Sequence, residues 1–289
     1  MQFTEISRAN NGNVSTAVFE LTVNDQNDRD AFESRLKDKI KRMKIHRSLV
    51  DNDFRDLLSP MMSEQFMTTV NDVVGRAGTP VEHSLVPFDV RRSRVTEFMS
   101  HLILEDNFGC VFHDVVDKRM NLDFHRADRH VEGIDVTGVQ TQGDKLRFVV
   151  CEVKATHVEA TSPSTVMTDL IKDIDKAHED HKQRLTREIV DTVSRLGENA
   201  ITSTEIKNII QFLTGVLAEK KSGEGYLKRV IFFPFLIKQN TNIPPISPGV
   251  EFSGFDEKTY PNSELQGVIW SFNEDLEAFC RKIYDEAIS

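Results

Sequence analysis

The chain has 289 residues, of which 39% are hydrophobic and 28% charged, a composition typical of a soluble globular protein with one or two domains. No apolar run approaches the roughly 20 residues that cross a bilayer, and the first residues lack the basic start and apolar stretch of a secretory signal. The net charge of −10 argues against a free-standing, tight nucleic-acid binder, because affinity for DNA comes mainly from Lys and Arg contacts to phosphate.

Two further features of the sequence indicate the cellular compartment and the cofactor needs of the protein. The three cysteines are far apart and have no CxxC spacing, so we read them as reduced thiols and expect a cytoplasmic protein. Neither a GxxxxGK[ST] loop nor a GxGxxG fingerprint is present, so we expect no nucleotide cofactor on this chain. Any activity on DNA would need a local basic patch, or a partner that delivers the DNA.

The N-terminal part reads as a small α/β region. Residues 14–23 are rich in β-branched side chains and predict a strand, and residues 30–44 predict a helix with one apolar face. The other face of that helix is basic, and we interpret it as a solvated face, with contact to phosphate or to an acidic partner as the alternative. A mostly helical segment over 53–74 and a Gly- and Pro-containing stretch follow. We place a boundary near residue 85, so that residues 1–85 form an N-terminal region with a possible partner-binding role.

Residues 86–289 predict a larger α/β unit. Strands and helices alternate in it, which indicates a mixed central sheet flanked by helices. The expected strands are 110–116, 131–139 (turning at Gly138), 146–153, 228–237 and 267–272. The expected helices are 91–106, 164–196, 204–220 and 274–288. Pro234 interrupts the strand over 228–237, which predicts a sheet edge or a bulge there.

The chemistry-bearing pattern is Gly-Ile-Asp-Val ending at Val136, a short turn, and then Val-Cys-Glu-Val-Lys ending at Lys154. Glu152 and Lys154 are two residues apart, so on a strand they point to one face while Val153 points into the core. A hairpin of this length would bring Asp135 beside Glu152. The alternative is a structural Glu–Lys pair at the solvent-facing end of an ordinary strand, because Glu-x-Lys alone is a weak motif.

Phosphodiester hydrolysis accounts for these residue types. It needs a divalent ion that polarises the phosphate and lowers the pKa of a bound water. Mg²⁺ prefers oxygen ligands and keeps several waters, so Asp135 and Glu152 suffice as side-chain ligands, with the Val153 carbonyl as a third ligand. Lys154 would hold or help deprotonate the attacking water and stabilise negative charge on the phosphate. Mn²⁺ is a possible substitute for Mg²⁺.

The order and spacing of these elements resemble the PD-(D/E)xK nuclease superfamily, with Ile134-Asp135 in place of Pro-Asp. The resemblance implies a restriction-endonuclease-like core over 86–289 and a Glu from the preceding helix in the metal site, for which Glu97 is the matching position. A surface role is the alternative for Glu97. The resemblance also implies that the helix after Lys154 contributes basic groups to the phosphate. Lys172 and Lys176 are candidates, although a salt-bridged helix surface fits their acidic neighbours better.

A narrower resemblance is to HamA, the nuclease subunits of the Hachiman anti-phage defence systems. It is carried by the helix that bears Glu97, the paired Asp135 and Glu152–Lys154 strands, and the Gly-Val-Ile-Trp ending at Trp270 before a C-terminal helix. It implies a DNA nuclease with a helicase partner of the HamB kind that supplies DNA. The alternatives are a catalytically silent nuclease-fold module that binds a partner protein or positions DNA, and a DNA-repair nuclease.

Overall fold

The computed structural model describes residues 2–12, 14–40, 88–112, 134–142, 145–158, 162, 164–180, 183–199, 203–222, 226–241, 246–255, 260 and 263–288. The predicted helix over 53–74, the boundary near residue 85 and most of the predicted strand over 110–116 lie outside these residues. No helix in the described ranges is long and apolar enough to cross a membrane.

The described strands form one mixed seven-stranded sheet in the order β1-β2-β7-β6-β5-β4-β3. Parallel pairing joins β2, β7, β6 and β5 in turn, while β1 pairs antiparallel with β2, and β4 pairs antiparallel with both β5 and β3. This confirms the predicted α/β class with a mixed central sheet. The strands are β1 (Gln2–Asn11), β2 (Val14–Thr22), β3 (Cys110–Val111), β4 (Val136–Gln142), β5 (Lys145–Thr156), β6 (Val230–Gln239) and β7 (Glu264–Phe272).

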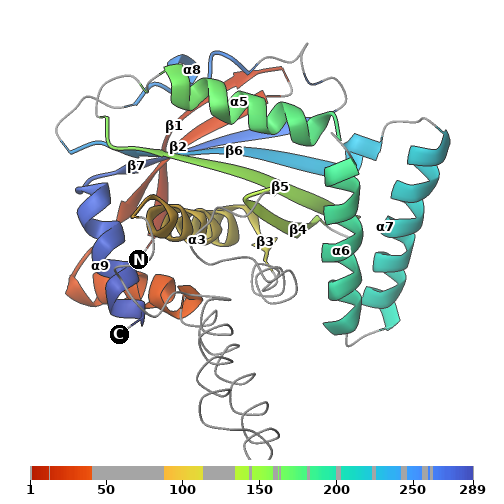
Figure 1. Cartoon of the computed structure of the whole chain (residues 1–289), viewed down its shortest axis with the longest axis horizontal. Coiled ribbons are helices and arrows are strands. Elements are labelled where there is room, and N and C mark those ends of the chain that lie inside the picture. The colour runs from red at the N-terminus through yellow and green to blue at the C-terminus, as the bar shows by residue number, and fades with distance from the viewer. Residues whose placement is uncertain are drawn as a thin grey trace, which may run out of the picture.

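Helices cover both faces of the sheet (Figure 1). The helix over residues 26–40, α3 (Phe88–Phe108) and α9 (Leu276–Ile288) bury one apolar cluster against one face. The helices α5 (Ser164–His178), α6 (Arg184–Asn199) and α7 (Ser203–Ser222) bury a second cluster on the opposite face. Two short helical segments, η2 (Tyr226–Arg229) and α8 (Pro248–Glu251), complete the described elements.

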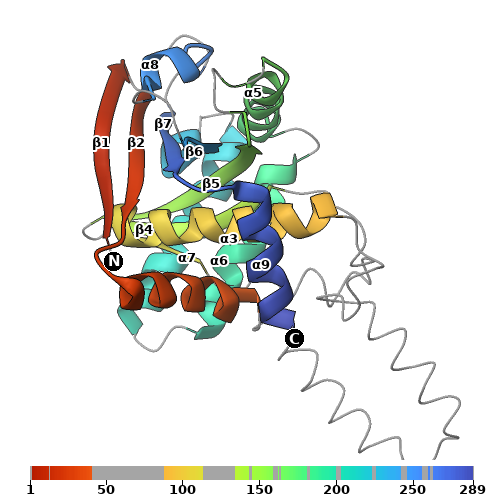
Figure 2. The same cartoon turned by 90° about the vertical axis from the view of Figure 1, so that its left-hand side faces the viewer.

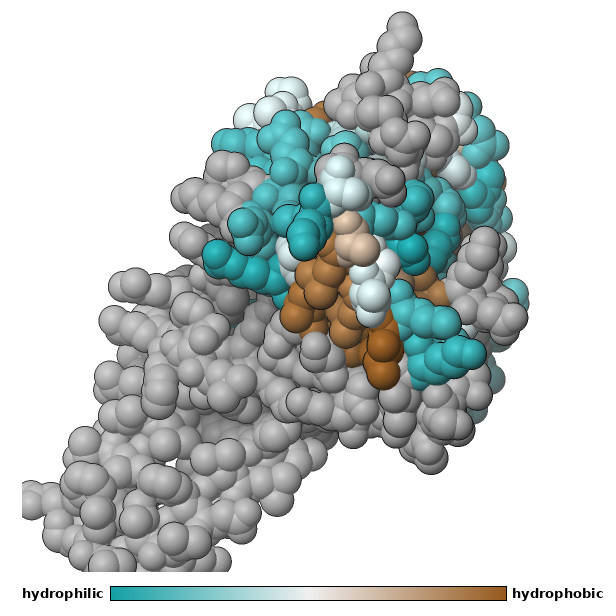
Figure 3. Space-filling model, turned by 90° about the vertical axis from the view of Figure 1, so that its right-hand side faces the viewer, coloured by the Kyte–Doolittle hydropathy of each residue, from teal (hydrophilic) through white to brown (hydrophobic). Residues whose placement is uncertain are grey.

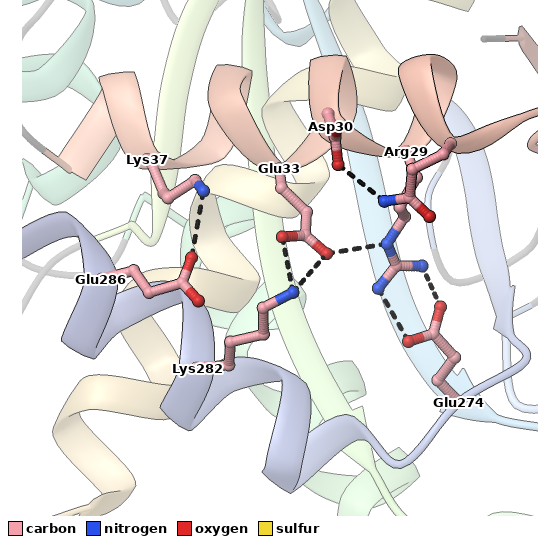
Figure 4. A network of polar contacts seen from close by, with 8 residues as sticks. Arg29, Asp30, Glu33, Lys37, Glu274, Lys282 and Glu286 are labelled. Atoms are coloured by element: carbon pink, nitrogen blue, oxygen red, sulfur yellow. Dashed lines mark hydrogen bonds and ion pairs between the residues drawn. The ribbon is translucent and has the colours of Figure 1, made fainter.

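The first strands and the helix over residues 26–40 share their sheet and core with the rest of the chain. β2 pairs with β7 from Val14–Leu265 to Glu20–Ser271. The helix over 26–40 lies beside α9 (Figure 2). Glu33 accepts hydrogen bonds from Arg29 at 2.8 Å and from Lys282 at 2.8 Å, and Arg29 also pairs with Glu274 (Figure 4). These contacts attach the helix to α9 and to the segment before it.

Three predicted details of the elements are corrected. The predicted helix over 164–196 is two helices, because Asp180 and Gln183 in the connection between α5 and α6 adopt positive φ angles of 49° and 60°. Pro234 lies in β6, between β5 and β7, and not at a sheet edge. The β6–β7 pairing runs from Phe232–Leu265 to Phe235–Val268 without a pair at Pro234, so the missing N–H falls in a gap of that ladder.

The third correction concerns Gly138, which lies within β4 and does not turn the chain. A Cβ atom at this position would come within 2.6 Å of the Val111 carbonyl oxygen and within 2.6 Å of Phe112 Cδ1. Glycine is therefore required by the close approach of the neighbouring β3 segment, and not by a turn.

One side of the molecule carries apolar surface. α7 exposes two large apolar side chains, Ile210 and Leu217, seven residues apart. Figure 3 shows the side on which α6 and α7 lie, and an apolar patch is visible there among polar residues.

Candidate active site

The pairing of β4 with β5 sets the position of Asp135. Val136 pairs with Cys151 in this antiparallel ladder, so the next step along it places Asp135 opposite Glu152. The backbone N–H of Val153 donates a hydrogen bond of 2.8 Å to Asp135 Oδ2. The carboxylate of Asp135, the residue just before β4, is therefore held against the Glu152–Lys154 segment, as the hairpin pattern predicts.

The alternation of β5 places Glu152 and Lys154 together. Val149, Cys151 and Val153 join the apolar cluster beneath α3, while Phe148 and Val150 join the cluster beneath α5. Glu152 and Lys154 continue the second series and face α5. The predicted burial of Val153 on the opposite side of the strand is thus confirmed.

Glu152 is almost fully enclosed, with 3% of its side chain exposed. Its Oε1 atom is buried and has no hydrogen-bond partner within the described part of the chain. The nearest cation is Arg184 at the start of α6, whose Nη2 lies 3.6 Å from Oε1. Burial raises the pKa of Glu152 well above its ordinary value, and the Asp135 carboxylate adds to this rise.

Asp135 experiences the same environment. Burial raises the pKa of Asp135, while the hydrogen bond from the Val153 N–H and the charge of Lys154 act in the opposite direction. The site thus contains two neighbouring carboxyl groups that both resist ionisation in the absence of a further positive charge.

Lys154 makes its contact with α5. Its Nζ atom donates a hydrogen bond of 2.8 Å to Asp173 Oδ2, and Lys176 donates one of 2.8 Å to Asp173 Oδ1. Burial lowers the pKa of Lys154, but the hydrogen bond to Asp173 and the charges of the nearby acids outweigh it, so the net direction is upward. Of the two basic candidates on α5, Lys176 adjoins this group through Asp173, whereas Lys172 is exposed.

Glu97 projects from α3 toward the same end of the sheet. It accepts hydrogen bonds from Ser93 Oγ at 3.0 Å and from Arg94 Nη1 at 3.3 Å. Burial raises the pKa of Glu97 to about 7, with Arg94 opposing the rise and Asp135 contributing to it. A purely surface position for Glu97 does not agree with its 13% exposed side chain.

The donor set can be compared with the needs of Mg²⁺. No group of three or more His, Cys, Asp or Glu side chains in the described ranges stands close enough together to hold a metal ion. Asp135 and Glu152 supply two carboxylates, which suffice for an ion that keeps several waters. Among the described residues, Glu152 Oε1 is a buried acceptor without a hydrogen-bond partner, of the kind that a cation would satisfy. The residues present therefore fit a two-carboxylate site for a hard divalent cation.

Two residues of this site do not follow from the motif. Asp173 is one of several acidic residues on α5, and the sequence gives no reason to prefer it to its neighbours. Arg184 reaches Glu152 because α5 ends at His178 and a separate helix, α6, begins at Arg184. In one continuous helix, Arg184 would lie at a different place. Six histidines are scattered over residues 113–181. His178 contacts Ser263 Oγ at 2.9 Å, His157 is exposed, and His113, His125, His130 and His181 lie outside the described residues.

Comparison with known proteins gives one family. The family model described as HamA matches residues 2–287. No curated protein matches the chain. The family match includes β1 and β2 as well as the β4–β5 site, so it spans the whole described sheet.

Proposed function

Because the chain belongs to the HamA family, we propose that it is a Mg²⁺-dependent deoxyribonuclease and the effector subunit of a Hachiman-type complex with a helicase partner of the HamB kind. Family membership supports a role as a defence effector of the Hachiman type. The nuclease chemistry is our inference, and one observation carries it. Asp135 and Glu152 lie opposite each other where β4 begins, and Lys154 lies on the same face of β5 as Glu152. Within the described residues, Glu152 Oε1 is buried without a hydrogen-bond partner.

Asp135, Glu152 and the Val153 carbonyl are the proposed metal ligands. When bound, Mg²⁺ (or Mn²⁺) polarises a phosphate oxygen and lowers the pKa of a bound water. Lys154 presents an ammonium group from the same strand face, where it can stabilise the negative charge that develops on the phosphate. Glu97 supports the site from α3, and its elevated pKa makes it a candidate to hold a proton next to Asp135.

The charge of the chain favours a partner that supplies the DNA. The net charge of −10 weakens the phosphate contacts on which free DNA binding depends. A helicase that moves along DNA would raise the local concentration of substrate at the active site without requiring a basic surface on this chain. We therefore propose that the chain acts in the cytoplasm within a complex.

The test is to express the chain together with the helicase and to follow plasmid integrity in cells and in purified complex with Mg²⁺. Loss of linear and circular DNA with the wild-type complex, and its survival with the variant carrying Glu152→Ala and Lys154→Ala, is the expected result. Undiminished degradation by that variant, while it still assembles with the partner, would show that another nuclease is responsible.

A further inference from the structure

The two oxygens of the Asp173 carboxylate have different partners. Oδ2 accepts from Lys154 on β5 and Oδ1 accepts from Lys176 on α5, each at 2.8 Å. The two lysines come from different elements, so this single carboxylate joins the sheet to the helix that covers it. It also fixes where both ammonium groups lie.

These groups differ in exposure: Glu152 is buried, Lys154 and Asp173 are partly exposed, and Lys176 is the most exposed. The exposed fraction of the side chain is 3% for Glu152, 27% for Lys154, 23% for Asp173 and 41% for Lys176. One carboxylate cannot use all the donors of two ammonium groups, because each ammonium has three. Each ammonium group therefore has donors beyond the one that it gives to Asp173.

The contact with Asp173 also bears on how Lys154 lies relative to the two buried acids. Lys154 lies on the same strand face as Glu152, and its charge interacts with both Asp135 and Glu152. Nevertheless Glu152 Oε1 has no hydrogen-bond partner among the described residues. The carboxylate of Asp173 thus draws the ammonium group away from the two acids that the proposed metal would need.

We propose that Asp173 is a positioning residue: it holds the ammonium groups of Lys154 and Lys176 side by side for one phosphate of the nucleic acid, and it keeps Lys154 off Asp135 and Glu152. This inference rests on the proposed nuclease function. Without Asp173, Lys154 turns to the acids and occupies them as an internal cation, and Lys176 loses the 2.8 Å contact with Oδ1 that joins it to the site.

The first arm of the test compares Asp173→Asn with Asp169→Asn. Asp169 lies one turn earlier on α5 and is exposed, so it controls for the loss of one negative charge from this helix. In the purified complex with the helicase partner, with a short DNA duplex and Mg²⁺, Asp173→Asn should lower kcat by about 10–100-fold, in the range seen when the groups that orient active-site residues are removed. Asp169→Asn should change kcat by less than about 2-fold, as is usual for exposed positions. Asp173→Glu should recover part of the loss.

The second arm does not depend on activity. Crystal structures of the wild type and of Asp173→Asn should place Lys154 on Asp173 in the first, and within hydrogen-bond distance of Asp135 or Glu152 in the second. Lys154 in the same position in both structures, or a kcat for Asp173→Asn equal to that of Asp169→Asn, would overturn the inference while leaving the nuclease proposal intact. If the wild type cleaves no DNA, the nuclease proposal fails, and the two structures still decide whether Asp173 controls the position of Lys154.

Discussion

Val153 and Asp135 are joined by a hydrogen bond of 2.8 Å from the backbone N–H of the first to the carboxylate of the second. This bond lies just before β4. Here a side-chain oxygen, in place of a backbone carbonyl, accepts from an N–H of β5. It holds the Asp135 carboxylate over the strand segment that carries Glu152 and Lys154. A loop residue thereby gains a fixed position relative to the sheet.

This bond predicts different stabilities for two substitutions of Asp135. Both Asp135→Asn and Asp135→Ala remove the buried charge, but only Asn keeps an oxygen that can accept from the Val153 N–H. We expect the Ala variant to be less stable than the Asn variant by about 1–2 kcal/mol, the cost of an unsatisfied buried donor. Urea unfolding without metal measures the difference. Equal free energies of unfolding would show that the bond contributes nothing to the fold.

A pH-dependent loss of stability should come from Glu97. Its pKa is raised from 4.5 to about 7 in the folded protein, so its stabilising contribution is fully present below pH 4.5 and is lost as the pH rises through about 7. Between pH 5 and pH 8, the wild type without metal should lose about 2–3 kcal/mol more than Glu97→Gln.

Chemical denaturation gives the free energy of unfolding of both proteins at pH 5 and pH 8. The difference between the two proteins at pH 5 is the reference for the difference at pH 8. An identical decline in the two proteins would mean that Glu97 ionises in the folded state as it does in the unfolded chain.

The close approach of the β3 segment to Gly138 predicts that an added methyl group there is destabilising. Gly138→Ala should cost about 1–3 kcal/mol, because the added Cβ meets a backbone carbonyl that cannot move without disturbing β3. Gly249→Ala is the matched control, since the nearest atom to a Cβ there is Ala9 Cβ at 3.9 Å. Thermal unfolding of the two variants should separate them by several degrees. A Gly138→Ala variant as stable as the wild type would show that β3 can move away at no cost.

The sequence predicts most of the fold where local pattern and tertiary structure agree. The expected helices over 91–106, 204–220 and 274–288 correspond to α3, α7 and α9. The apolar run in β5 predicts a strand, which lies between β6 and β4 in the sheet. The position of Glu152 and Lys154 on one face follows from strand geometry alone. Because Asp135 lies just outside β4, its place beside Glu152 depends on the pairing register, which the short connection between the two strands largely determines.

The parts that could not be predicted depend on distant partners. β1 alternates weakly between apolar and polar residues, and its pairing with β2 makes it a strand. Pro234 predicts a sheet edge or a bulge, and in the structure it lies inside the sheet at a gap in the β6–β7 ladder. Asp173 and Arg184 reach the site through the packing of α5 and the break before α6, and neither event has a local sequence signature. The proposed roles of residues 1–85 in partner binding, and of Lys172 in DNA contact, remain predictions.

A buried ion pair connects β6 to α8. We therefore expect the effects on stability of substituting its two residues to be strongly coupled. Lys238 and Glu251 form this pair, both side chains are almost completely buried, and Glu251 Oε2 also accepts from the backbone N–H of Ser162 at 3.2 Å. Lys238→Met alone should cost about 3–5 kcal/mol, because it leaves a buried carboxylate without its cation. Combining it with Glu251→Leu should recover much of that loss. Urea unfolding provides the measurement, and additive costs in the double variant would contradict the coupling.

The central claim is that Asp135, Glu152 and Lys154 form one metal-dependent nuclease site. The most direct measurement is Mg²⁺-dependent cleavage of linear DNA by the purified complex, with Glu152→Gln and Lys154→Ala compared with Asp169→Asn as the exposed control on α5. We expect wild-type protein and Asp169→Asn to cleave the DNA, with the chelator EDTA stopping both. Glu152→Gln and Lys154→Ala should lose at least about 100-fold in rate while remaining folded. Cleavage at the wild-type rate by either variant would contradict the assignment of this site.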